Sequence, residues 1–336
     1  MFEEEILNCV QISQLPFSWG IHIVEITISL LALILNCALA STIYNAIPIS
    51  QQQRRALAAL SLNYACIAGY QLARNIYYVV SMHSVCMNAV TTASCKLQEF
   101  PLLFSYVHCV FAIALIALQS TEELNEDRRF IHCSNTCSIQ QSLLVVFSLC
   151  LSLYFTAFDV ELKTIEMSEC SLLMAIQDDM KCYILLTVLM CPHVVFTFYF
   201  GFLRKIQFHN SDFRLLYTMS MRDIIGLQSA CWMVLMLLSG GLILVRFVAL
   251  YPNANHLTEL LEITFVLGPL CIAFAHPFLL LWHNVSVRNS AVRLCPSLRA
   301  IMPQCDPITP PRPRRVALNN SHSSNNRALP VIRMSV

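Results

Sequence analysis

The sequence predicts an all-α membrane protein, a bundle of seven transmembrane helices with its N-terminus outside the cell and its C-terminus in the cytosol. Of the 336 residues, 57% are hydrophobic and only 12% are charged, against roughly 25% charged in soluble domains. The apolar residues also occur in runs of membrane-crossing length. The placement of arginine and lysine between these runs predicts the orientation of the bundle.

Each apolar run is long enough to cross a bilayer as a helix. About 20 apolar residues span a hydrocarbon core of ~30 Å, and within lipid the backbone groups must find their partners inside the protein, as they do in a helix. The second run is the weakest, because Asn63, Gln71, Arg74 and Asn75 interrupt it. The expected spans are residues 21–46, 56–80, 100–120, 142–158, 182–203, 224–250 and 257–282.

Basic residues support both the number of spans and the orientation. Omitting the second span would place Arg128 and Arg204 outside, against the positive-inside rule. The outer side instead collects acids, among them Glu99 and Glu259. With seven spans the outer loops hold Lys96, Lys163 and Lys181, and the cytosolic segments hold Arg54, Arg55, Arg128, Arg129, Arg204, Lys205, Arg214 and Arg222.

The segments outside the spans also differ in character. Residues 1–20 carry three glutamates at positions 3–5 and lack the pattern of a cleaved signal peptide, so we expect a short extracellular N-terminus. Residues 283–302 contain Arg288, Arg293 and Leu294 and predict an amphipathic helix on the inner membrane surface. Residues 303–336 are rich in proline and predict a disordered cytosolic tail. Cys295 is a candidate for palmitoylation.

Two cysteines in outer segments form the leading disulfide candidate. Cys95 precedes the third span and Cys170 lies in the long acidic segment before the fifth, so both face an oxidising compartment during synthesis. A bridge between them would restrict that segment. Cys9 and Cys86 are also expected outside, and pairings with them remain open.

Ionisable residues inside the spans are candidates for ligand binding, because each costs about 2.5–3.5 kcal/mol at the centre of a membrane helix. Glu25 and Arg74 are expected at similar depth near the outer side, where a direct ion pair is possible. For each residue a helix-packing role is the competing interpretation. The expected outer pocket contains Glu25, Arg74, Tyr77, His108, Arg246, Glu259 and Glu262.

The chain has no motif of a soluble enzyme. GxSxG, HExxH, P-loop and GxGxxG patterns are all missing from the sequence, and the net charge of +1 does not favour nucleic-acid binding. His276 and His283 are seven residues apart with no third ligand, which is weak support for a metal site. We therefore expect no catalysis, no cofactor and no metal.

Pro192 and Pro277 lie inside the fifth and seventh spans and are candidates for helix kinks.

The arrangement of these features resembles that of G-protein-coupled receptors over about residues 21–299. Cys231-Trp232 is similar to the toggle motif of the rhodopsin-like class without its proline, and His276-Pro277 stands where that class has Asn-Pro. Asn36 and Asn63 lie near the polar positions of its first two helices. The short termini, many cysteines and altered motifs look most like the nematode serpentine chemoreceptors.

This resemblance implies a receptor in the plasma membrane of sensory cells that detects an environmental small molecule and signals to a heterotrimeric G protein. A seven-helix ligand-gated cation channel of the insect chemoreceptor type and a small membrane transporter are the alternatives. The basic distribution opposes the orientation of such a channel, and no internal repeat supports a transporter. The expected contacts with the G protein are Arg128, Arg129, Arg204, Lys205 and Arg222.

Overall fold

A computed structural model gives the arrangement of the helices. It describes residues 19–46, 51–81, 90–125, 134–157, 166–167, 170, 172–176, 179–207, 213–248 and 255–302. Most of the expected N-terminal segment and the whole expected tail, 303–336, lie outside these residues. Arg128 and Arg129 also lie outside them.

Long helices make up most of the described chain, as the apolar runs predict. They are α2 (Trp19–Tyr44), α3 (Gln51–Ser81), α4 (Thr92–Asn125), α5 (Ser134–Ala157), α7 (Asp179–Gln207), α8 (Phe213–Val248) and α9 (Asn255–His283). Within the described residues, six of them contain a stretch long and apolar enough to cross a membrane. The chain is therefore a multi-pass helical membrane protein. In α7 the apolar stretch found there, Met180–Val195, is shorter.

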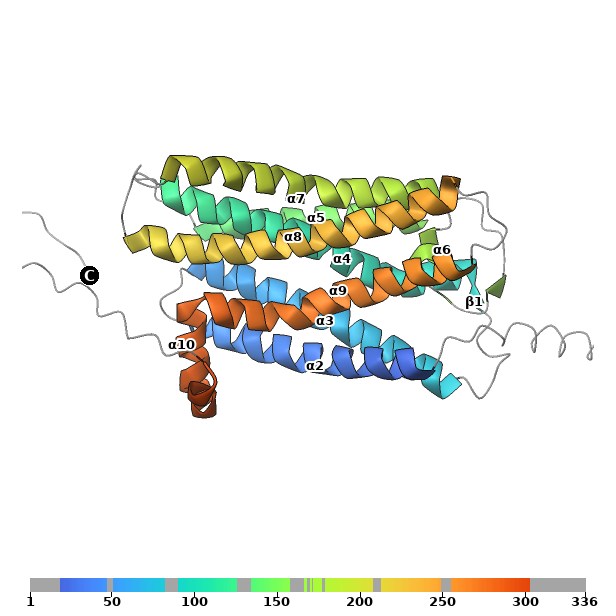
Figure 1. The fold of residues 1–336 in the computed structure, drawn as a ribbon, viewed down its shortest axis with the longest axis horizontal. Coiled ribbons are helices and arrows are strands. Elements are labelled where there is room, and N and C mark those ends of the chain that lie inside the picture. Colours follow the sequence, from blue (N-terminus) through green and yellow to red (C-terminus); the bar gives the residue numbers. More distant parts are fainter. Residues whose placement is uncertain are drawn as a thin grey trace, which may run out of the picture. The chain divides into compact units, whose positions relative to one another are not determined.

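The long helices lie side by side and alternate in direction (Figure 1). α2 packs against α3 and α9, and α8 packs against α7 and α9. The short helix α6 (Leu172–Ile176) and the strand β1 (Val90–Thr91) lie at one end of the bundle, and α10 (Val285–Leu294) crosses the opposite end. We call these the disulfide end and the α10 end.

Helix α4 is the central element of the bundle. It contacts α3, α5, α6, α7 and α8, and 67% of its apolar stretch is buried, against 22% for α5. The core that surrounds α4 includes Tyr64, Ile113 and Trp232, whose side chains are almost completely buried. Large apolar side chains are exposed on the outer helices, especially α5, as expected for a surface in contact with lipid.

Gly268 allows α9 to approach α8 closely. A Cβ atom at this position would overlap the side chain of Leu235. We expect Gly268→Ala to lower the free energy of unfolding by about 1–3 kcal/mol through overpacking. Gly241→Ala is the matched control, because a Cβ there meets no atom within 4 Å. Thermal unfolding in detergent measures both variants, and an equal effect of the two would contradict the close approach.

Helix α10 begins with a side-chain cap that fixes its direction after α9. The Asn284 Oδ1 accepts hydrogen bonds from the backbone N–H groups of Ser286 and Val287, each at 3.1 Å. Arg288 is buried and donates to the carbonyl of Trp282 at 3.1 Å. A 3-10 helix, η2 (Pro296–Ala300), follows α10.

Candidate functional site

A disulfide holds the segment before α7 against the start of α4. Cys95 lies in the first turn of α4, and its bond to Cys170 joins Cα atoms 5.2 Å apart. Both cysteines are buried. The strand β2 (Glu166–Met167) pairs with β1 in antiparallel register, so that Val90 lies opposite Met167. The covalent bond and the strand pair together fix this segment at the disulfide end.

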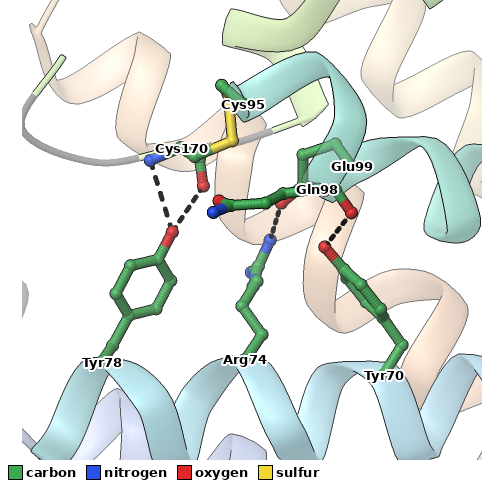
Figure 2. Close-up of a disulfide and its surroundings, with 7 residues drawn as sticks. All are labelled: Tyr70, Arg74, Tyr78, Cys95, Gln98, Glu99 and Cys170. Atoms are coloured by element: carbon green, nitrogen blue, oxygen red, sulfur yellow. Dashed lines mark hydrogen bonds and ion pairs between the residues drawn. A yellow bond between two sulfur atoms is a disulfide. The ribbon is translucent and has the colours of Figure 1, made fainter. Parts of the chain in front are cut away.

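Three side chains of α3 point from one face toward α4 and Cys170 (Figure 2). The Tyr78 hydroxyl donates to the Cys170 carbonyl at 2.8 Å and accepts from the Cys170 N–H at 3.3 Å. The Tyr70 hydroxyl donates to the carbonyl of Gln98. Positions 70, 74 and 78 are four residues apart and therefore share a helix face, which explains how one helix can reach three partners.

Arg74 forms a buried ion pair with Glu99. Its Nη1 atom lies 3.1 Å from the Glu99 Oε1, and Glu99 is only 1% exposed. The guanidinium also lies over the Tyr78 ring, 6.0 Å from its centroid. Arg74 therefore contacts Glu99 of α4 and does not form the direct ion pair with Glu25 that the sequence left open.

Glu25 lies close to His22 of α2 and Asn75 of α3. Its carboxylate lies 3.9 Å from the His22 Nδ1 and is 3% exposed. The same His22 nitrogen is 2.9 Å from the Asn75 Oδ1 of α3. Arg74 still interacts electrostatically with Glu25, although it does not contact it. Glu25, Arg74 and Glu99 thus form a buried charged cluster contributed by α2, α3 and α4.

Polar side chains of neighbouring helices bond to the carbonyls that prolines leave unpaired in α9. Pro269 and Pro277 have no N–H, so the carbonyls of Phe265 and Ala273 lose their usual helical donors. The Tyr106 hydroxyl of α4 donates to the Phe265 carbonyl at 3.0 Å. The Asn36 amide of α2 donates to the Ala273 carbonyl at 2.8 Å.

The bond between Tyr106 and Phe265 predicts a measurable loss when the hydroxyl is removed. We expect Tyr106→Phe to lower the free energy of unfolding by about 1–3 kcal/mol, because the carbonyl of Phe265 stays buried without a donor. Tyr77→Phe is the control, since Tyr77 is 51% exposed. In a Pro269→Ala background, where position 269 regains its N–H, the loss from Tyr106→Phe should shrink. An unchanged loss in that background, measured by thermal unfolding, would contradict this account.

A polar chain at the centre of the bundle connects α3, α8 and α9 through His276. The Gln228 amide nitrogen donates to the His276 Nδ1, so the proton of the neutral ring is on Nε2. Nε2 lies 3.1 Å from the Ser61 hydroxyl oxygen, which itself donates to the Leu57 carbonyl at 3.0 Å. The Trp232 indole of α8 donates to the Tyr64 hydroxyl at 3.2 Å beside this chain.

Comparison with known proteins places the chain in a nematode family. No protein-family model matches it. An uncharacterized protein of Caenorhabditis elegans, T09B9.5, is 32% identical over 307 residues, which cover 91% of this chain and 85% of the relative. The chain belongs to the family of this nematode protein. The relative's name assigns no activity, so the role of the site has to be argued from its residues.

In the structure, only some of the residues expected in the ligand pocket lie close together. Glu25 and Arg74 belong to the buried cluster, whereas Tyr77 lies on the exposed side of α3. His108 stacks on Phe104 with ring centroids 5.7 Å apart. His108 is nine residues, or two and a half helical turns, after Glu99 and therefore lies on the opposite face of α4. The side chains of Arg246, Glu259 and Glu262 lie outside the described residues.

Glu99 is the site residue that the sequence interpretation missed. The third span was expected to begin at residue 100, which left Glu99 in an outer loop. Helix α4 begins at Thr92 instead, so Glu99 lies within the bundle. The spacing of seven residues from Glu99 to Tyr106 is two helical turns and could have indicated a shared buried face.

The other expected positions lie away from this cluster. Pro192 lies inside the continuous helix α7 and Pro277 inside α9. Two prolines not singled out from the sequence also lie inside helices, Pro101 in α4 and Pro269 in α9. Cys295 is exposed directly after α10. Arg204 and Lys205 fall in the last turns of α7 and Arg222 in α8, but their side chains lie outside the described residues.

Proposed function

We propose that the chain is a seven-span chemosensory receptor that binds a small molecule at the disulfide end and signals to a heterotrimeric G protein at the α10 end. The observation that carries the proposal is the Cys95–Cys170 disulfide. It ties the start of α4 to the segment before α7, a connection by which the sequence resembles G-protein-coupled receptors. In this proposal the disulfide end faces outward and the receptor resides in the plasma membrane of sensory cells.

Helix α7 supplies the seventh crossing in this proposal. It is 29 residues long, and at 1.5 Å per residue it exceeds the thickness of a hydrocarbon core. It also packs against α4 and α8, which are both long apolar helices. A crossing by α7 puts the basic residues Arg204 and Lys205 on the same side as Arg54 and Arg288, in agreement with the positive-inside rule.

The mechanism requires two arrangements of the bundle. A ligand that binds the active arrangement more tightly than the resting one shifts the population toward it. The contacts of α8 with α3 and α9 include the polar pairs Gln228–His276 and Trp232–Tyr64. We propose that these contacts change when the α10 ends of α7 and α8 separate, which exposes Arg204, Lys205 and Arg222 to the G protein.

Antibody access to terminal tags tests the orientation. A tag before Met1 should stain intact cells, and a tag after Val336 should stain only after permeabilisation. The reverse result would contradict the receptor proposal and favour the cation channel of the insect chemoreceptor type, whose N-terminus is cytosolic. Recording of ligand-gated currents would then be the next experiment.

Signalling is tested separately in cells that report dissociation of the G-protein subunits after addition of a volatile or water-soluble chemical. Replacement of Arg204, Lys205 and Arg222 together by alanine should abolish the response while surface staining stays normal. Arg299→Ala removes one basic residue outside the expected contacts and is the control, which should respond normally. If the triple variant responds as well as the unchanged chain, the proposed contact surface is wrong.

A further inference from the structure

The buried cluster at the disulfide end contains two carboxyl groups and one guanidinium. Glu25 and Glu99 are 3% and 1% exposed, and Arg74 is the guanidinium that interacts with both. Its ion pair at 3.1 Å uses one oxygen of Glu99. The His22 Nδ1 lies 2.9 Å from the amide oxygen of Asn75, so this nitrogen carries a hydrogen even when the ring is neutral. Arg74 pairs directly with only one of the two carboxyl groups, and the nearest polar neighbours of the other, Glu25, include His22 at 3.9 Å.

Two buried oxygen atoms of the cluster lack a donor, and the Nε atom of Arg74 lacks an acceptor, among the residues that the structure describes. The two oxygens are Glu99 Oε2 and Gln71 Oε1. The orientation of the Gln71 amide follows from Tyr106, whose hydroxyl donates to the carbonyl of Phe265 at 3.0 Å. That hydroxyl can therefore only accept from Gln71, at 3.4 Å, through the Nε2 atom. The oxygen of Gln71 is left free, and a buried acceptor without a donor is costly.

Helix geometry brings these groups to one place. Gln71 precedes Arg74 by three residues and Asn75 by four, so it lies one turn below both on the same face of α3. Glu99 meets this face at Arg74, and Glu25 meets it at Asn75. The two carboxyl groups thus approach α3 at the neighbouring positions 74 and 75, one turn from Gln71.

We propose that this cluster binds the protonated amine of a small organic ligand. Glu25 supplies a second carboxyl group, and Glu99 Oε2 and Gln71 Oε1 accept N–H groups of the ligand. An ammonium group carries up to three donors and a positive charge, which match the two free acceptors and the carboxyl group that Arg74 does not contact. An anionic ligand would have to bind the Nε atom of Arg74, a buried donor without a partner in the described residues, and would meet the two carboxyl groups as well.

This inference rests on the proposed function, since it names the ligand class for the same end of the bundle. Binding to the purified full chain tests it independently of signalling. The probes are phenethylamine and isoamylamine, each compared with the alcohol and the carboxylic acid of the same carbon skeleton. We expect the amines, and neither the alcohols nor the acids, to raise the temperature of unfolding in a concentration-dependent way.

Glu25→Gln should weaken binding of the amines roughly 10- to 100-fold, the range expected for loss of a charge-assisted contact. Glu161→Gln removes an acid from the segment before α7 and should bind as the unchanged chain does. Gln71→Met removes the free acceptor without changing charge and should also weaken binding, which provides a second test if Glu25→Gln does not fold.

The proposal is overturned if no amine in the panel stabilises the chain, if alcohols or acids stabilise it equally, or if both variants bind amines as the unchanged chain does. Amine binding that depends on Glu25 without any G-protein response would support this inference and contradict the proposed function. If amines do not bind but the chain signals in response to other ligands, this inference is wrong and the proposed function is supported.

Discussion

Replacement of Arg74 by methionine should lower the free energy of unfolding by about 3–5 kcal/mol, because it leaves the Glu99 carboxylate buried and without its partner. The pair is a strong candidate for so large an effect, since the side chains are only 13% and 1% exposed. Chemical unfolding in mixed micelles measures the loss.

The double variant Arg74→Met/Glu99→Leu distinguishes a buried charge from simple loss of packing. It removes both charges and should cost less than Arg74→Met alone, because buried ion pairs can often be replaced by apolar residues at little cost. Arg299→Met, an exposed arginine after α10, is the control and should change stability little. If the double variant were less stable than Arg74→Met, the pair would matter through packing instead.

Cys170→Ser should lower the free energy of unfolding by about 2–4 kcal/mol, because the disulfide closes a long loop in the unfolded chain. The two cysteines are 75 residues apart in the sequence. Cys295→Ser is the matched control, since Cys295 is an exposed free cysteine. Thermal unfolding with and without dithiothreitol measures the effect.

Reduction provides a check within the same experiment. Dithiothreitol should lower the stability of the unchanged chain toward that of Cys170→Ser and leave that variant unaffected. Equal sensitivity of the two proteins to the reductant would mean that another disulfide or another thiol is responsible.

The long helices could be predicted because their cause is local. Apolar runs of membrane length must form helices in lipid, and each expected run coincides with one long helix, although α4, α5 and α8 begin 8 to 11 residues before the expected spans. The beginning of α4 could not be predicted in the same way, because Lys96 and Glu99 interrupt the hydropathy on which the span was based. These residues lie inside the helix since the bundle buries them, and Glu99 finds its partner on α3.

The cluster could be predicted only in part for the same reason. Hydropathy and depth identified Glu25 and Arg74 as unusual residues, but a partner on another helix depends on how three helices pack. The polar partners of α9 are a second example. Proline predicts a free carbonyl four residues earlier, yet the sequence does not say that Tyr106 and Asn36 are the donors.

The donors to α9 constrain how this nematode family can diverge. A relative that loses the proline at position 269 regains the helical N–H and no longer needs the hydroxyl at position 106, and the same holds for position 277 and the amide at position 36. A relative that keeps the proline but loses the donor leaves a carbonyl unpaired in a buried helix. We therefore expect relatives to keep both members of each pair, the proline of α9 and its donor, or to have replaced both.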